Sequence, residues 1–204
     1  MPRPRDHEPV LLLDVMGTLV YDPFYELMPG WFGLTFDELL AQKDPHAWVD
    51  FEHGAIDEAT FAERFFADRR PVDGARLREQ ARASFRLLDG AAEVLDTLKD
   101  RGVAMHAFSN YPDWWRDVEA ACGLSRWLEW SFVSCEMGLR KPDPAAYRHV
   151  LAELDVPAER CVFVDDQPRN VAAAKAEGMV GLDAADLPRL PELLDAWPPA
   201  DAGG

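Results

Sequence analysis

The chain has 204 residues, of which 48% are hydrophobic, so it can bury a core of its own and has room for one domain with a modest insertion. Its 37 acidic residues outnumber its 21 lysines and arginines, and the formal net charge of −16 disfavours nucleic acid and anionic membranes as partners. The cysteines Cys122, Cys135 and Cys161 lack metal-site spacing, the N-terminal residues lack a signal-peptide core, and no apolar run reaches membrane-spanning length. We therefore expect a cytoplasmic protein with buried thiols.

The first predicted element is a buried strand over residues 10–13. Its four apolar residues lead directly into Asp14, and a turn with Gly17 and Thr18 follows. In parallel sheets, binding sites form beyond the carboxyl ends of the strands. The pattern therefore predicts that this strand delivers Asp14 to a functional site.

Residues 21–88 show no convincing strand pattern. Short helices are predicted there over residues 35–42, 45–53, 57–69 and 73–87. Thr35 and Asp57 are suitable N-caps, while Gly54 and the stretch 71–74 separate the helices. The segment is therefore expected to be a helical insertion.

From residue 89 onward, helices and strands alternate. Helices are predicted over residues 89–101, 113–122, 144–154 and 168–177, and strands over residues 103–108, 130–134, 161–165 and 179–182. Such alternation predicts an α/β fold with a doubly wound parallel sheet. We expect a core of residues 1–20 and 89–204, interrupted by a small helical-bundle cap of residues 21–88, and a frayed tail over residues 197–204.

Reactive side chains follow the predicted strands and should meet at one edge of the sheet. In chain order they are Asp14, Ser109 with Asn110, Lys141, and Asp165 with Asp166. Carboxylates gathered without cysteine or histidine suit Mg²⁺. A hydroxyl, a lysine and loop N–H groups suit a phosphoryl group. The sequence thus predicts a site for a metal and a phosphorylated small molecule.

Four motifs carry a family resemblance. They are Asp14-Val-Met-Gly-Thr18, Phe108-Ser-Asn110, Arg140-Lys-Pro-Asp-Pro-Ala-Ala-Tyr147 and Val164-Asp-Asp-Gln-Pro-Arg-Asn170. In this order, each at a predicted strand end or in the loop after it, they make the chain resemble the haloacid dehalogenase (HAD) superfamily, in the branch with a small helical cap between the first two motifs. The resemblance spans residues 11–182 and implies a HAD-like Rossmannoid core.

The resemblance also implies roles for individual residues. Asp14 resembles the nucleophile that forms a covalent aspartyl intermediate, Ser109 the residue that hydrogen-bonds the transferred group, and Lys141 the residue that holds the nucleophile and neutralises phosphoryl charge. The implied Mg²⁺ ligands are Asp14, Asp166, the main-chain carbonyl of Met16 and, as ligand or close neighbour, Asp165. The residues expected to bind substrate or support the site are Thr18, Asn110, Tyr111 and Asn170.

Met16 stands where phosphatases of this family carry a second aspartate, which protonates the leaving oxygen and then activates water. A thioether has no transferable proton, so a rate enhancement of about 10²–10⁴-fold from acid–base catalysis is missing.

We favour a Mg²⁺-dependent phosphatase-type enzyme for a small phosphorylated metabolite, either slow or restricted to good leaving groups. One alternative is a non-phosphatase HAD hydrolase such as a 2-haloacid dehalogenase, which the pair Asp165 and Asp166 disfavours; a phosphonate hydrolase would need a cap lysine, and Lys43 lies in unlike surroundings. The other is a catalytically impaired scaffold that binds a phosphorylated ligand or partner.

Overall fold

The computed structural model describes residues 8–197 and confirms the α/β fold, which is built on a five-stranded parallel sheet. The strands lie in the order β3-β2-β1-β4-β5. Their bounds are β1 (Val10–Leu13), β2 (Ala104–Ser109), β3 (Glu129–Val133), β4 (Cys161–Asp165) and β5 (Val180–Asp183). The strand order reverses between β1 and β4, so the crevice that binds ligands in such sheets is expected where these two strands end.

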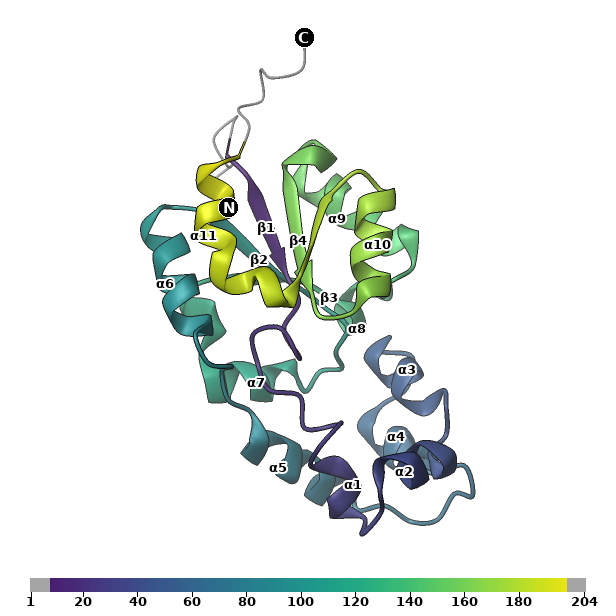
Figure 1. The fold of residues 1–204 in the computed structure, drawn as a ribbon. Coiled ribbons are helices and arrows are strands. Elements are labelled where there is room, and N and C mark those ends of the chain that lie inside the picture. The colour runs from purple at the N-terminus through teal and green to yellow at the C-terminus, as the bar shows by residue number, and fades with distance from the viewer. Residues whose placement is uncertain (1–7, 198–204) are drawn as a thin grey trace.

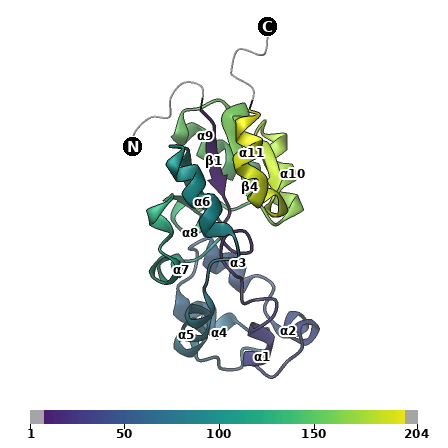
Figure 2. The same ribbon diagram turned by 60° about the vertical axis from the view of Figure 1, so that its left-hand side comes forward.

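Helices cover both faces of the sheet (Figures 1 and 2). One face carries α6 (Ala91–Asp100), α7 (Trp115–Cys122) and α11 (Leu190–Asp195), and the other carries α9 (Pro144–Leu154) and α10 (Pro168–Ala176). Strand β1 is buried on both faces: Leu11 and Leu13 belong to one hydrophobic cluster and Leu12 to the other, as the two-residue period of a strand requires. The short helices α8 (Ser134–Met137) and α11 were not predicted, because one turn or two leaves little periodicity to detect.

Five helices from the segment between β1 and α6 lie together beyond the carboxyl ends of the strands (Figures 1 and 2). They are α1 (Met28–Trp31), α2 (Phe36–Gln42), α3 (Ala47–Glu52), α4 (Glu58–Arg64) and α5 (Gly74–Ser84). The predicted caps are present: Thr35 forms a capping box with Glu38, and Asp57 accepts the N–H of Thr60 at 2.8 Å. The helices therefore stand over the edge of the sheet to which Asp14 is delivered.

Two of these helices end earlier than the sequence predicts. Helix α4 stops at Arg64 because the following chain pairs with residues 42–44 instead: Phe66 bridges Lys43, and Ala67 donates to the carbonyl of Gln42 at 2.9 Å. The predicted helix over residues 57–69 is therefore too long at its C-terminal end. Pairing of the chain on both sides of an inserted loop competes with helix propensity, and a single sequence does not reveal such pairing.

Helix α5 stops at Ser84 rather than at residue 87, for a similar reason. Val20 and Leu87 form an antiparallel bridge, Leu88 donates to the carbonyl of Leu19 at 2.9 Å, and Tyr21 donates to that of Arg86 at 2.9 Å. The stretches that enter and leave the helical segment therefore run side by side. This pairing fixes where the segment joins the sheet.

Within residues 8–197, no helix combines the length and apolar character needed to cross a bilayer. All three cysteines are free thiols; Cys122 and Cys161 are buried, as predicted, but Cys135 is partly exposed, so the prediction of buried thiols is wrong for that residue. Of the tail predicted to fray, residues 198–204 lie outside the described residues.

Candidate active site

Lys141 lies at the centre of the candidate site and is almost fully buried, with 1% of its surface exposed. Its ammonium group donates to Asp14 Oδ1 at 2.8 Å, to Asp165 Oδ2 at 2.6 Å and to the carbonyl oxygen of Phe108 at 2.6 Å. These three bonds use every donor of the group. Burial disfavours the charge, but the two carboxylates outweigh it and raise the pKa of Lys141, so this residue is a permanent cation.

Asp14 follows β1 directly and is held from both sides. Its main-chain N–H donates to the carbonyl of Val164 in β4 at 2.9 Å, and its Oδ2 accepts the hydroxyl of Thr18 at 3.3 Å. Burial raises the pKa of Asp14 to about 7, against the lowering influence of Lys141, and the neighbouring Asp165 adds to the rise. A second cation beside Asp14 would further favour its ionised form.

Three carboxylates converge at this edge of the sheet. One oxygen from each of Asp14, Asp165 and Asp166 lies within 4.8 Å of the others. Asp165 is fully buried and oriented by the main-chain N–H of Gln167 at 2.8 Å and by Asn170 Nδ2 at 3.0 Å. An oxygen-only set of this kind fits a hard divalent cation such as Mg²⁺. The structure thus brings together the side chains for which the sequence implied metal binding.

The turn after Asp14 is tightly determined. The carbonyl of Val15 accepts the N–H groups of Leu19 and Val20 at 2.9 and 2.8 Å, and Gly17 donates to the carbonyl of Val20 at 2.8 Å. Gly17 has φ +84°, and a Cβ there would lie 2.9 Å from Asp166 Oδ2, so both backbone conformation and space require glycine. Met16 lies in this turn between Val15 and Gly17, whose main-chain groups form these hydrogen bonds, and it lines the same cavity as Asp14.

Ser109 is the last residue of β2 and Asn110 follows it, and their side chains make different contacts. Ser109 is buried, and its hydroxyl has no hydrogen-bond partner within residues 8–197. Asn110 instead commits its amide to the main chain of Lys141: Nδ2 donates to the carbonyl at 2.7 Å, and Oδ1 accepts the N–H at 2.8 Å. The Ser109 hydroxyl is therefore available to a ligand, whereas Asn110 fixes the position of Lys141.

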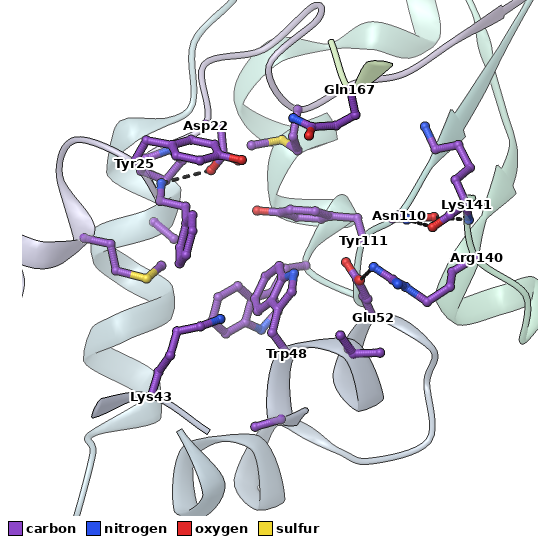
Figure 3. A pocket seen from close by; sticks show the side chains of 18 of the residues that line it. Asp22, Tyr25, Lys43, Trp48, Glu52, Asn110, Tyr111, Arg140, Lys141 and Gln167 are labelled. Atoms are coloured by element: carbon purple, nitrogen blue, oxygen red, sulfur yellow. Dashed lines mark hydrogen bonds and ion pairs between the residues drawn. The ribbon is translucent and has the colours of Figure 1, made fainter. Parts of the chain in front are cut away.

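A cavity of about 290 Å³ opens beside this cluster (Figure 3). Asp14, Lys141 and Asp166 form one end of it. Its other walls are mainly aromatic and come largely from the helical segment: Phe24, Trp48, Phe61, Phe65, Tyr111 and Trp114. Tyr111, for which the sequence predicts substrate binding, lines the cavity, and its N–H donates to Ser134 Oγ at 3.0 Å. Of the aromatic residues after the first motif, Phe24 and Tyr25 line the cavity, whereas Trp31 and Phe32 do not and only pack against the hydrophobic core.

Some cavity residues were not predicted from the sequence. Glu52, at the end of α3, is buried and forms an ion pair with the partly exposed Arg140, the residue before Lys141 (Figure 3). Burial raises the pKa of Glu52, and Arg140 opposes the rise. Ser134 Oγ also donates to the main-chain carbonyl of Glu52, and a Cβ on Gly54 would lie 2.6 Å from the carbonyl oxygen of Cys135. Such contacts join segments far apart in the chain, so no local sequence pattern predicts them.

Comparison with known proteins agrees with this geometry. The model of the haloacid dehalogenase-like hydrolases matches residues 10–178. The chain is 45% identical over 174 residues to flavin mononucleotide hydrolase 1, a chloroplast protein of Arabidopsis thaliana, covering 85% of this chain and 71% of that protein. It is 33% identical over 151 residues to the sesquiterpene phosphatase astK of Aspergillus oryzae, covering 68% and 72%. A HAD family enzyme of Bacteroides thetaiotaomicron, solved as an Asp12Ala mutant with magnesium and inorganic phosphate, has the same fold, with a TM-score of 0.64, 17% identity, and coverage of 84% of this chain and 91% of that one. The chain belongs to the haloacid dehalogenase-like hydrolases.

Proposed function

We propose that this hydrolase is a Mg²⁺-dependent phosphatase that acts on a small phosphomonoester through a phosphorylated Asp14. The observation that carries the proposal is the contact of Lys141 with Asp14 and Asp165, beside a cluster of three carboxylates. The phosphatase relative astK and the magnesium and phosphate of the Bacteroides enzyme support the same reaction class. The activity of the Arabidopsis relative makes flavin mononucleotide (FMN) the first substrate to test.

In the proposed reaction, the Asp14 carboxylate attacks phosphorus, an Asp14–phosphorus bond forms, and the bond to the leaving oxygen breaks. Lys141 keeps Asp14 in place and offsets negative charge as it develops on the phosphoryl oxygens. The free Ser109 hydroxyl donates to one of these oxygens. Bound by Asp14, Asp165 or Asp166 and the Met16 carbonyl, Mg²⁺ would supply further positive charge for the phosphoryl oxygens.

Met16 provides no proton to the leaving oxygen and no base for the water that then cleaves the aspartyl phosphate. The leaving group must therefore depart as a stable anion or take its proton from water. This sets the proposed enzyme apart from a phosphatase with an acid at this position and predicts slow turnover of alkyl phosphates. A 2-haloacid dehalogenase needs no such proton, but it also needs no metal, and the carboxylate cluster supports the phosphatase.

We also propose that residues 21–88 act as a cap over a core of residues 1–20 and 89–204. The ion pair of Glu52 with Arg140 and the hydrogen bond from Ser134 to Glu52 support this division, because both join α3 to loops at the sheet edge. Thr18 and Tyr111 are proposed to contact substrate from the core side, and Asn110 to act through Lys141. A cytoplasmic location remains a prediction from the sequence.

The test is phosphate release from FMN and from p-nitrophenyl phosphate, with Mg²⁺ and with a chelator. We expect metal-dependent release that Asp14→Asn abolishes, and calorimetric Mg²⁺ binding that Asp166→Asn weakens. Calorimetry that detects no Mg²⁺ binding, with or without phosphate, contradicts the proposal. Asp14-dependent halide release from a 2-haloacid supports the dehalogenase, and thermal stabilisation by phosphate without any turnover supports a binding scaffold.

A further inference from the structure

Lys43 projects into the cavity from the side opposite Lys141 (Figure 3). It is the only lysine in residues 21–88, and it follows α2 directly. The two lysines thus occupy opposite ends of one cavity: Lys141 is bound to the carboxylates at the sheet edge, and Lys43 stands among the aromatic walls formed by the helical segment.

The main chain around Lys43 is firmly held. Its N–H donates to the carbonyl of Leu39 at 2.9 Å, and the residue bridges Phe66 on the returning chain. Asp44, the next residue, donates to the carbonyl of Phe65 at 2.9 Å and accepts the N–H groups of His46 and Ala47 at 2.8 and 3.1 Å. The position from which the side chain enters the cavity is therefore defined by the fold.

The ammonium group of Lys43, by contrast, has neither a hydrogen bond nor an ion pair within residues 8–197. Its Nζ lies 5.2 Å from the centroid of the Phe24 ring, which is a cation–π contact. Two buried acids act on Lys43 electrostatically, but both have other partners: Glu52 is paired with Arg140, and Asp44 with Arg69. Burial lowers the pKa of Lys43, against the raising influence of Glu52 and Asp44. The donors of this partly buried ammonium group are therefore available to a ligand that enters the cavity.

Trp48 lines the same cavity as Lys43, and both residues can be followed in Figure 3. Trp48 is braced edge-on by Phe51 and Phe61, with ring centroids 6.1 and 5.5 Å away, so its face cannot easily rotate. A rigid aromatic wall beside a cation with free donors suits a flat ring that carries hydrogen-bond acceptors on its rim.

We propose that Lys43 and Trp48 recognise the leaving group, and that the substrates are phosphomonoesters of a planar heteroaromatic compound with carbonyl or ring-nitrogen acceptors. The phosphate would lie at Asp14 and Lys141, and the ring would reach Trp48 with an acceptor at the Lys43 ammonium. This inference rests on the proposed function, since it assigns the far end of the same cavity. Lys43 and Trp48 touch no reacting atom and act on specificity.

The experiment compares FMN, whose leaving group is planar and rich in acceptors, with acetyl phosphate, which has no ring. Lys43→Met is expected to lower the ratio of kcat/KM for FMN to that for acetyl phosphate about tenfold, through KM for FMN, and Lys43→Arg to restore part of it. Lys175→Met, on the exposed side of α10, is the matched control and should leave the ratio unchanged. An equal ratio in wild type and Lys43→Met overturns the inference.

A binding measurement separates failure of the inference from failure of the proposed function. Riboflavin has the ring but no phosphate, so its fluorescence reports the far end of the cavity without turnover. We expect wild type to quench it, and Lys43→Met and Trp48→Leu each to weaken binding about tenfold. No phosphate release with normal riboflavin binding would contradict only the phosphatase. Phosphate release without riboflavin binding, or with equal riboflavin binding by wild type and Lys43→Met, would contradict only the leaving-group site.

Discussion

The side chain of Asn110 exchanges two hydrogen bonds with the main chain of Lys141, as donor at 2.7 Å and acceptor at 2.8 Å. Asn110 immediately follows β2, and Lys141 lies in the loop between α8 and α9. A side-chain amide that pairs with both main-chain groups of one residue fixes that residue much as a neighbouring strand would. The hydrogen bond from Lys141 to Asp14 therefore depends on Asn110, although no hydrogen bond joins Asn110 to Asp14 or Asp165 within the described residues.

Replacing Asn110 by alanine is expected to reduce both stability and turnover. Two partly buried main-chain groups would lose their partners, which costs about 1–3 kcal/mol in the free energy of unfolding. The Lys141 ammonium would be held less well, so kcat should fall while KM changes little. Urea unfolding and steady-state kinetics measure the two effects. If stability falls and kcat does not, the three contacts of the ammonium group are sufficient to place it.

Ser109→Ala is expected to separate stability from activity. The buried hydroxyl has no partner within the described chain, so its removal should leave the free energy of unfolding unchanged or raise it by up to about 1 kcal/mol. A hydrogen bond to a charged phosphoryl oxygen contributes about 1.5–3 kcal/mol, so phosphatase kcat/KM should fall about 10- to 100-fold.

Thermal unfolding and kinetics on the same preparation check this pair of outcomes. Ser131→Ala provides the control, because Ser131 lies on the next strand and its hydroxyl contacts His106 rather than the cavity. A loss of stability in Ser109→Ala without a loss of activity would show that the hydroxyl serves the fold.

The sheet and its reactive edge could be predicted from the sequence because their signals are local. Strand β1 is a short apolar run that ends on Asp14, and β4 repeats that pattern before Asp165. Parallel topology then brings the two carboxylates together without further information. The predicted C-terminal end of α4 was wrong because its cause is not local. The helix ends at Arg64, where the chain begins to pair with residues 42–44.

The far end of the cavity also escaped prediction. Lys43 and Trp48 lie on a helical segment whose docking depends on contacts such as those of Glu52 with Arg140 and Ser134. In the sequence, Trp48 is one aromatic residue among many, and a lysine near a helix end usually faces water. Only the docked arrangement distinguishes these residues from ordinary packing and surface positions.

Stability is expected to fall as the pH drops through the range below about 6.5, in part because of His106. This residue lies on β2, is buried, and contacts Ser131 Oγ at 2.8 Å through Nδ1. Burial lowers the pKa of His106 from its ordinary 6.5, and this outweighs the raising influence of Glu129. The unfolded chain then binds the proton more strongly than the folded protein, so the free energy of unfolding rises with pH across this window.

His106→Gln keeps a polar contact to Ser131 without titrating, so it should flatten the dependence of unfolding free energy on pH between 5 and 7. Urea unfolding at several pH values measures this slope. His46→Gln removes an exposed histidine at the start of α3 and provides the comparison. Identical slopes in wild type and His106→Gln would show that other groups account for the acid sensitivity.

Met16→Asp is expected to increase the hydrolysis of alkyl phosphates most. An aspartic acid at this position would supply the missing proton to the leaving oxygen and a base for water, with a gain of about 100-fold at the low end of general acid–base catalysis. Riboflavin would leave FMN as an alkoxide and needs that proton, whereas p-nitrophenolate leaves p-nitrophenyl phosphate as a stable anion, so hydrolysis of the latter should gain much less. Met16→Asn introduces a side chain of the same shape as aspartate but without a transferable proton. This variant should hydrolyse neither substrate faster than the wild type. Equal gains on both substrates, or gains by Met16→Asn, would mean that the methionine limits access to the cavity rather than proton transfer.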